Sequence, residues 1–255
     1  MLGCRFLAAL AALLPLSTLS AQESPSAASR LTIVSYNIRH GEGMDGKTDY
    51  ARIARHFTDR QADVVAVQEV DSVTGRSGGQ DMLRRLADES GLHPTFARAI
   101  AFDGGAYGVG LLSRERPLSV RRIPLPGREE PRVLLVAEFA DCCVACTHLS
   151  LTPEDQLASL PVIREVAAAS QKPFFLAGDW NAKPDEPFLR ALRKEFRLLT
   201  DGKTPTWPAD APVDLLDYIA VWKRSPRRVK CEESAVIPDS VSSDHRPIVA
   251  RVRLR

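Results

Sequence analysis

Residues 64–71 read VVAVQEVD, and they give the clearest indication of the fold class. Four consecutive apolar residues, three of them β-branched valines, predict a strand that is buried on both faces. Strands of this kind occur where helices cover a sheet, so the stretch favours an α/β protein. The apolar run ends in Gln68 and Glu69, which places polar side chains directly at the end of the predicted strand.

Strands and helices alternate on both sides of this stretch. Residues 31–38 are apolar and β-rich, which predicts a strand, and residues 48–49 can cap a helix that has an apolar face. Residues 80–90 have helical spacing, and Gly91 predicts the end of that helix. Residues 95–149 have mainly the pattern of successive strands.

The second half of the chain continues this mixture. Helical spacing follows Pro153, and we expect Pro161 to break or kink that segment, because proline lacks the N–H that a helix needs. Further elements are predicted at residues 173–177 (strand), 186–196 (helix), and 218–221, 229–236 and 248–253 (strands). The pattern predicts one α/β domain with layered sheets over residues 31–255. The run of strands at its centre argues against a purely parallel, doubly wound sheet.

The N-terminal residues have the pattern of a secretory signal. Arg5 precedes an apolar run at residues 6–16, and mostly small residues follow. This predicts a signal peptide over residues 1–21 and a short polar segment over residues 22–30; a frayed N-terminal helix is the alternative. The apolar run is shorter than the roughly 20 residues of a membrane span. We therefore expect no transmembrane anchor and an exported product, either periplasmic or secreted.

The charge of the chain is nearly balanced. The formal net charge is +2, and charges of both signs are interspersed. The composition therefore does not predict strong non-specific attraction to nucleic acid. A local basic groove would not show in the composition.

Four cysteines lie beyond the predicted signal peptide: Cys142, Cys143, Cys146 and Cys231. Strand alternation places Cys142 and Cys146 on one face and Cys143 on the other, so Cys231 can reach only one of them. A zinc cluster would need thiolates at turn-like spacing, which a strand does not give. We expect at most one disulfide and mostly buried thiols.

Polar residues cluster where the predicted strands end. The side chains of chemical interest are Asn37, Glu69, His148, Asp179, Asn181, Asp217, Asp244 and His245. Strand ends in an α/β protein meet at one rim, where loops can build a site. Taken singly, each residue is more often a turn residue, a helix cap or a solvated side chain. The set as a whole is hard to explain as independent caps.

Three of these residues have the chemistry of metal ligands. The carboxylate and amide oxygens of Glu69, Asn37 and Asp244 are hard ligands, which suit Mg²⁺ or Mn²⁺. Mg²⁺ keeps several waters, so one or two protein carboxylates are enough to bind it. The metal would polarise a phosphoryl oxygen and offset the charge that develops on a leaving group.

The other residues have the chemistry that handles water and protons. Asp179 can take a proton from the attacking water or orient it, with Asn181 fixing its geometry. His245 can titrate near neutral pH and needs a carboxylate to orient its ring, for which Asp217 is the candidate. His148 can donate to a phosphate or to the oxyanion as it forms.

Seven segments together carry a resemblance. They are SYNIRHG from Ser35, VVAVQEVD from Val64, YGVGLLSRERPL from Tyr107, CTHLSLTPEDQ from Cys146, LAGDWNAKP from Leu176, LLDYIAV from Leu215 and SSDHRPIVA from Ser242. With these segments the chain resembles the endonuclease/exonuclease/phosphatase superfamily, which has the fold of pancreatic deoxyribonuclease, and it looks like an exported, bacterial-type member. A single segment is only moderately specific, but the set covers nearly all of the mature chain in the superfamily's order.

The resemblance implies a four-layered α/β sandwich, in which helices flank two mixed β-sheets. It also implies that Glu69 is the principal metal ligand, that Asn37 lies beside it, and that Asp244 can serve a second metal position.

The resemblance further implies catalytic roles. Asp179 and Asn181 resemble the pair that activates and orients water. His245 with Asp217 resembles the supported histidine, and His148 the histidine that faces the phosphate. Members of the superfamily assign the general base either to an aspartate or to a histidine, so both candidates stay open here.

Two departures from the superfamily pattern stand out. Arg39 occupies the position two residues after Asn37, where an acidic residue is often found, and this favours a single metal. The arginine that usually precedes Gln156 is not evident. Neither departure removes a core catalytic residue.

The sequence therefore predicts an exported, metal-dependent hydrolase of a phosphodiester or a phosphomonoester. Nucleic acid, a phospholipid headgroup of the sphingomyelinase type and a small soluble phosphoester compete as substrates. The alternative is a non-catalytic binding module of the same fold, which should have lost at least one core residue, and none is lost. We expect a monomer without a stable protein partner.

Overall fold

The computed structural model describes residues 29–255. The predicted signal peptide and residues 22–28 of the predicted polar segment lie outside the described residues. Within the described part, no helix is long and apolar enough to cross a membrane. The first strand already begins at Ser29, because Ser29 and Arg30 pair with the last strand of the chain.

Two six-stranded sheets form the centre of the molecule. The first sheet has the strand order β11 (Val229–Val236), β12 (Ile248–Leu254), β1 (Ser29–Asn37), β2 (Val64–Ser72), β4 (Gly105–Ser113) and β3 (His93–Phe102). The second has the order β5 (Ser119–Leu125), β6 (Arg132–Glu138), β7 (Cys143–His148), β8 (Phe174–Asp179), β10 (Asp217–Trp222) and β9 (Phe196–Leu198). Each sheet has one parallel pair at its centre, β1–β2 and β7–β8, between antiparallel neighbours.

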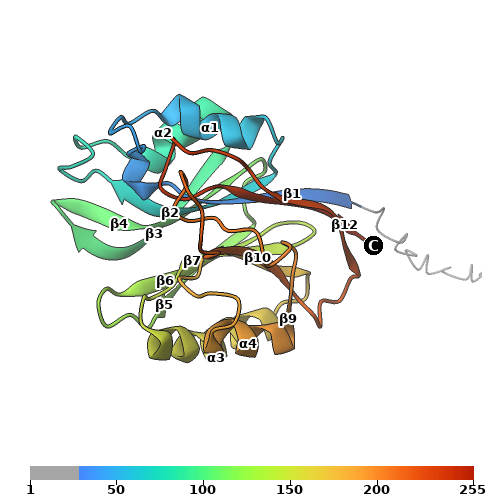
Figure 1. Cartoon of the computed structure of the whole chain (residues 1–255). Coiled ribbons are helices and arrows are strands. Elements are labelled where there is room, and N and C mark those ends of the chain that lie inside the picture. The colour runs from blue at the N-terminus through green and yellow to red at the C-terminus, as the bar shows by residue number, and fades with distance from the viewer. Residues whose placement is uncertain (1–28) are drawn as a thin grey trace, which may run out of the picture.

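Helices cover the outer face of each sheet, as Figure 1 shows. The helices α1 (Tyr50–Thr58) and α2 (Met82–Ser90) pack on the first sheet, and α3 (Pro153–Ala168) and α4 (Pro187–Glu195) pack on the second. A short 3-10 helix, η1 (Arg39–Gly41), follows β1. The four-layered sandwich of two mixed sheets flanked by helices is confirmed.

The ends of the first two helices follow from their sequence. The Asp49 carboxylate accepts the Arg52 backbone N–H at 2.8 Å, and the Asp81 carboxylate accepts the Arg84 backbone N–H at 3.1 Å. A side-chain cap of this kind stabilises a helix by about 1 kcal/mol. Gly91 ends α2 in the left-handed conformation (φ 70°), which glycine adopts without strain.

Two elements differ from the prediction. The helix α3 continues through Pro161 without ending there. Pro161 and Leu157, whose carbonyl would otherwise accept the missing N–H, both lie on the exposed face, where water can bond to the free carbonyl. The short edge strand β9 is too brief to leave a period-two pattern, and the sequence did not predict it.

The inner core lies between the two sheets. Side chains that alternate along the strands fill it, among them Ile33, Ala66, Cys146, Ala177 and Ile219. Cys142 and Cys146 lie in this inner core and Cys143 lies under the outer helices, as strand alternation predicted. All four cysteines of the described part are free thiols.

Candidate active site

Three polar side chains form one row at the end of the second sheet where β7 and β8 finish and β10 begins. His148 ends β7, Asp179 ends β8 and Asp217 begins β10, and the strand register pairs Asp179 with both of the others. Each lies two residues from an inner-core residue on its own strand: Cys146, Ala177 and Ile219 respectively. Because side chains alternate along a strand, all three face the first sheet. The apolar rows of the inner core therefore end in a polar row.

Asn37 joins the two sheets at this edge. It ends β1 on the same side as inner-core residue Ile33, and it is fully buried. Its amide nitrogen donates to Glu69 Oε1 at 2.9 Å and to Asp179 Oδ2 at 3.0 Å. The amide oxygen accepts the Arg39 backbone N–H at 3.1 Å. Asn37 thus holds two carboxylates, one from each sheet, next to each other.

Glu69 is turned toward this point by an irregularity in β2. The register between β2 and β4 shifts between Val67 and Val70, and Glu69 has a φ of 58°. A β-bulge of this kind re-aims a side chain, and strained backbone at a non-glycine residue is typical of functional sites. Burial raises the pKa of the Glu69 carboxyl, and the nearby Asp244 and Asp179 raise it further, against the hydrogen bond from Asn37.

His245 is held between two aspartates. Its Nδ1 lies 2.9 Å from Asp217 Oδ2, and its Nε2 lies 3.6 Å from Asp179 Oδ2. Burial opposes the charged form of the ring, but Asp217 and Asp179 together outweigh burial and raise the pKa of His245 to about 10. The imidazolium form is therefore favoured at neutral pH.

His148 reaches the same aspartate from the other side, in a different environment. Its Nε2 lies 3.5 Å from Asp179 Oδ2. Burial lowers the pKa of His148 to about 4, and Arg132 and His245 lower it as well, against the attraction of Asp179. The pKa values of the two imidazoles around Asp179 are thus shifted in opposite directions.

Asn181 fixes the other oxygen of Asp179. Its backbone N–H donates to Asp179 Oδ1 at 2.9 Å, and its side-chain amide donates to the Leu149 carbonyl at 2.9 Å. Asn181 has a φ of 49°, and the Gln156 side chain holds its carbonyl at 2.8 Å. Asn181 therefore orients Asp179 through Oδ1 and connects the loop after β8 to the loop after β7.

Asp244 enters the site on the loop before β12. The neighbouring Ser243 hydroxyl donates to the Asn37 carbonyl at 2.7 Å and lies 3.3 Å from Asp244 Oδ1. The same hydroxyl accepts the His245 backbone N–H at 3.4 Å. Ser243 thus anchors the Asp244–His245 pair to the end of β1.

The donor set fits a hard divalent cation. Glu69, Asp244 and Asp179 bring carboxylates together, and a cation would offset the burial and the smaller repulsion that raise the pKa of Glu69. Atoms of Asp179, Asp217 and His245 lie within 4.8 Å of one another and also form a group that could hold a metal. In that group, however, His245 Nδ1 and Asp217 already bond to each other. Glu69 with Asp244 is therefore the better candidate for the metal position.

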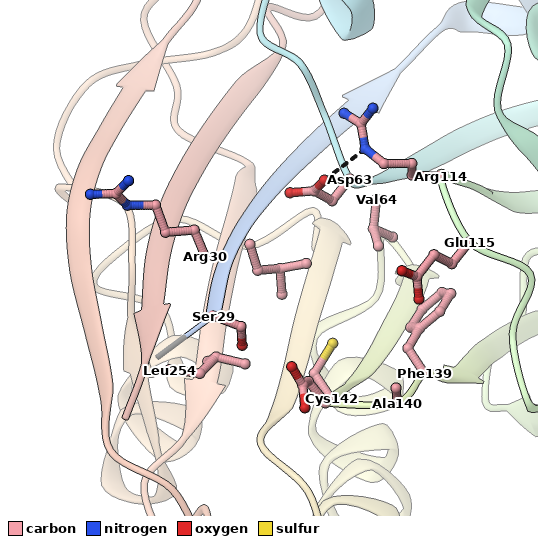
Figure 2. A pocket seen from close by; sticks show the side chains of 12 residues that line it. Ser29, Arg30, Asp63, Val64, Arg114, Glu115, Phe139, Ala140, Cys142 and Leu254 are labelled. Atoms are coloured by element: carbon pink, nitrogen blue, oxygen red, sulfur yellow. Dashed lines mark hydrogen bonds and ion pairs between the residues drawn. The ribbon is translucent and has the colours of Figure 1, made fainter. Parts of the chain in front are cut away.

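A hollow of about 230 Å³ lies at the end of the sandwich opposite to these residues (Figure 2). Its lining includes Ser29, Asp63, Arg114, Phe139 and Cys142, and none of the predicted site residues. Asp63 and Arg114 form an ion pair there at 2.9 Å. This hollow has no group of side chains around one reacting position.

Comparison with known families identifies the chain. Residues 34–245 match the model of the Endonuclease/Exonuclease/phosphatase family. The chain belongs to this family. No curated protein gives a significant match in sequence.

Several solved structures have a similar fold. An endonuclease/exonuclease/phosphatase from Beutenbergia cavernae is 22% identical, with 88% of this chain and 72% of its own covered and a TM-score of 0.72. An endonuclease/exonuclease/phosphatase from Bacteroides vulgatus is 18% identical, with 89% and 100% covered and a TM-score of 0.73. A mannosyl-6-phosphatase from Bacteroides thetaiotaomicron is 16% identical, with 88% and 99% covered and a TM-score of 0.68. At these identities the likeness shows the shared fold.

The structure brings all the predicted site residues of this family member to one edge of the sandwich. The assignment of Glu69, Asn37 and Asp244 to metal binding stays a prediction, as do the individual catalytic roles. Sequence reasoning missed the anchoring role of Ser243 and the buried Arg132, whose Nε has no hydrogen-bond partner among the described residues. Arg132 follows Pro131 without any local signal that marks it as buried.

Proposed function

We propose that the chain is an exported, divalent-metal-dependent phosphoesterase that hydrolyses a phosphodiester or a phosphomonoester with an activated water. The observation that carries this proposal is the convergence on Asp179. Asn37 and two histidines approach its Oδ2, and Asn181 holds its Oδ1. A carboxylate that must present one oxygen to a water needs its orientation fixed, and these contacts from several segments fix Asp179.

The proposed chemistry divides among the residues by position. Asp179 orients the attacking water and accepts its proton. His245, held by Asp217, places positive charge beside the reacting phosphate, and the neutral His148 donates a hydrogen bond to a phosphoryl oxygen. This division keeps Asp179 as the acceptor; a histidine acceptor is the competing assignment.

Glu69 and Asp244, with Asn37 between the sheets, would hold Mg²⁺ or Mn²⁺. When bound, such an ion polarises a phosphoryl oxygen and offsets charge on the leaving group. The raised pKa of Glu69 supports this proposal, because a carboxylate that is buried and lies near Asp244 and Asp179 gains from a cation at that place.

The test is hydrolysis of an aryl phosphodiester and an aryl phosphomonoester by the purified protein, with Mg²⁺ or Mn²⁺ and then with excess chelator. We expect turnover that stops with chelator and returns when metal is restored. Turnover that ignores chelator would contradict the metal role, and no turnover on any phosphoester would contradict the enzyme.

The substrate class needs a wider panel. The same fold includes the mannosyl-6-phosphatase and a 2′,3′-cyclic phosphatase, so the fold alone does not select a substrate. Plasmid DNA, RNA, sphingomyelin and sugar phosphates, each compared at equal metal concentration, would rank the three candidate classes.

Export is supported by the sequence of the first residues alone. Arg5, the apolar run at residues 6–16 and the small residues after it form a signal that would be cleaved near Ala21. N-terminal sequencing of the protein recovered from a bacterial periplasm or culture medium tests this. A product that still begins at Met1 and stays in the cytoplasm would contradict export.

A further inference from the structure

The loop that carries Asp244 and His245 is fastened to helix α1 some distance from the site. It runs between the end of β11 at Val236 and the start of β12 at Ile248, with no helix or strand of its own. His56 on α1 bonds through its Nε2 to Asp239 Oδ2 on this loop. Both side chains are mostly buried, at 16% and 12% exposure. We call this His56–Asp239 pair the latch.

The latch is set firmly on its α1 side. The Tyr36 ring packs edge-on against the His56 ring, with centroids 5.5 Å apart and planes at 88°. Such a contact restricts the ring to one orientation. Because Tyr36 is fully buried on β1, the position of His56 is tied to the first sheet as well as to its own helix.

The other oxygen of Asp239 shapes the loop itself. Asp239 Oδ1 accepts the backbone N–H groups of Val241 at 2.7 Å and Ser242 at 3.0 Å. Burial works to raise the pKa of Asp239, but the hydrogen bonds from His56 and Ser242 outweigh it and lower the pKa. The carboxylate therefore holds α1 with one oxygen and the turn with the other.

The turn leads directly into the site. Ser243 follows it, and its hydroxyl bonds to the Asn37 carbonyl at 2.7 Å and lies 3.3 Å from Asp244 Oδ1. The hydrogen bonds of Asp239 and the short covalent segment 241–244 therefore connect His56 to Asp244. None of the chemical roles proposed above uses His56 or Asp239.

A second contact clamps the same loop from its other side. The Val241 carbonyl accepts the Met44 backbone N–H at 2.8 Å. The neighbouring Asp45 forms a two-point ion pair with Arg52 of α1, at 2.9 and 3.1 Å. Helix α1 therefore holds the loop both directly and through the segment that follows η1.

We propose that His56 and Asp239 are positioning residues that hold Asp244 in place for a divalent cation. The inference rests on the proposed function, in which Asp244 is a metal ligand. If the loop became ordered only when the metal bound, the entropy lost in that ordering would lower the affinity for the metal. The latch orders the loop beforehand and so removes this cost. Removal of a group that orients a ligand typically lowers metal affinity about 10- to 100-fold.

The test compares Mn²⁺ affinity in matched variants of the full protein. His56→Ala removes the latch, His56→Gln keeps an N–H donor near Asp239, and Arg55→Ala removes an exposed charge one residue away on the same helix. Electron paramagnetic resonance of free Mn²⁺ gives the dissociation constants without any substrate. We expect about tenfold weaker binding in His56→Ala, a smaller loss in His56→Gln, and wild-type binding in Arg55→Ala. At saturating Mn²⁺ the KM for an aryl phosphodiester should stay at its wild-type value in all three.

Equal Mn²⁺ affinity in His56→Ala and Arg55→Ala would overturn the inference. If His56→Ala does not fold, Asp239→Asn replaces it, because the asparagine keeps one oxygen as the acceptor for the turn and has an NH2 group in place of the oxygen that bonds to His56. Wild-type protein that binds no Mn²⁺ would overturn the proposed function instead. The latch is then decided by the downfield proton resonance of His245 Nδ1. Loss of this resonance in His56→Ala but not in Arg55→Ala supports the latch. Persistence of the resonance in every variant overturns it.

Discussion

The two ends of the sandwich contain the same kinds of side chain in different arrangements. One end of the sandwich is where the strands β1, β2, β7 and β8 have their carboxyl ends. There Asp179 is almost fully buried and has partners from both sheets. At the opposite end, Asp63 bonds to the Thr32 backbone N–H and pairs with Arg114 beside an open hollow (Figure 2). Each end therefore has an aspartate that faces basic side chains.

The difference lies in how each aspartate is satisfied. Each oxygen of Asp63 accepts one hydrogen bond, one from the Arg114 guanidinium and one from the Thr32 backbone N–H. Asp179 faces two imidazoles at 3.5 and 3.6 Å, beyond ordinary hydrogen-bond length, and lies near two further carboxylates. The candidate site therefore differs from the opposite end in the like charges that lie near its aspartate, since Asp179 and Asp63 each also accept ordinary hydrogen bonds.

The largest effect should come from removing Asp179. Asp179→Ala takes away the group around which the others are arranged, and we expect kcat to fall by about 10³-fold or more. The matched control is Asp63→Ala, which removes an aspartate from the opposite end and should leave kcat/KM unchanged. Steady-state kinetics on an aryl phosphodiester, with circular dichroism to confirm folding, distinguish the two. Similar losses in both variants would end the distinction between the two ends.

The next effect concerns packing at each end. A Cβ at Gly178 would lie 1.9 Å from the Thr147 carbonyl oxygen, so Gly178→Ala must push β7 and β8 apart. We expect a loss of about 3 kcal/mol or more in the free energy of unfolding. Gly91→Ala, at the opposite end, meets open space and suffers only from its φ of 70°, which costs about 1 kcal/mol.

Urea unfolding of both glycine variants measures this difference directly. Activity adds a second readout, because Gly178 immediately precedes Asp179. A Gly91→Ala variant that is less stable than Gly178→Ala would contradict the account of the close β7–β8 approach.

A smaller effect is expected from acid. Burial works to raise the pKa of Glu129, but hydrogen bonds from the Ser150 hydroxyl and the Leu151 backbone N–H outweigh it and lower the pKa to about 2. A carboxyl with a depressed pKa stabilises the fold above its unfolded pKa of about 4.5 and loses that contribution as pH falls toward 2. Because Glu129 is partly exposed, solvent weakens the effect.

Thermal unfolding of wild type and Glu129→Gln between pH 2 and pH 7 checks this sign. The wild type should be the more stable protein at neutral pH, and the difference should shrink below about pH 4.5. A difference that stays constant down to pH 2 would show that the hydrogen bonds of Glu129 do not depend on its charge.

The smallest effect should come from the ion pair of the opposite end. Arg114→Ala breaks the contact with Asp63, in which the two side chains are 56% and 32% exposed. Exposed pairs contribute less than about 1 kcal/mol. Urea unfolding should therefore show a small loss, with unchanged kcat/KM; any loss of activity would show that the two ends are coupled.

Much of the fold could be predicted because its signals are local. The valines of β2, the cap at Asp49 and the stop at Gly91 each depend on a few neighbouring residues. Of the two outcomes expected at Pro161, a break or a kink, the break does not occur, because the freed carbonyl lies on the exposed face of the helix, which local sequence does not reveal. The strand β9 was not predicted, because its three residues are extended only through their pairing with β10.

The site could be predicted as a set of residues but not as an arrangement. Their places after strands pointed to one rim, and the rows through Cys146, Ala177 and Ile219 explain why they share a face. The bridge from Asn37 to Asp179 joins residues 142 positions apart, and no local pattern encodes such a contact. The bulge at Glu69 depends likewise on pairing with β4.

The bridge made by Asn37 has a consequence for how the protein loses activity. Asn37 belongs to one sheet and Asp179 to the other, and Gln68 and Cys146 make a second polar contact between the sheets, at 3.3 Å. Neither sheet contains the site by itself. A state that keeps its helices and strands but loosens its inner packing would therefore be inactive. Turnover reports the docking of the two sheets, and in mild denaturant it should vanish while the far-ultraviolet circular dichroism is still native.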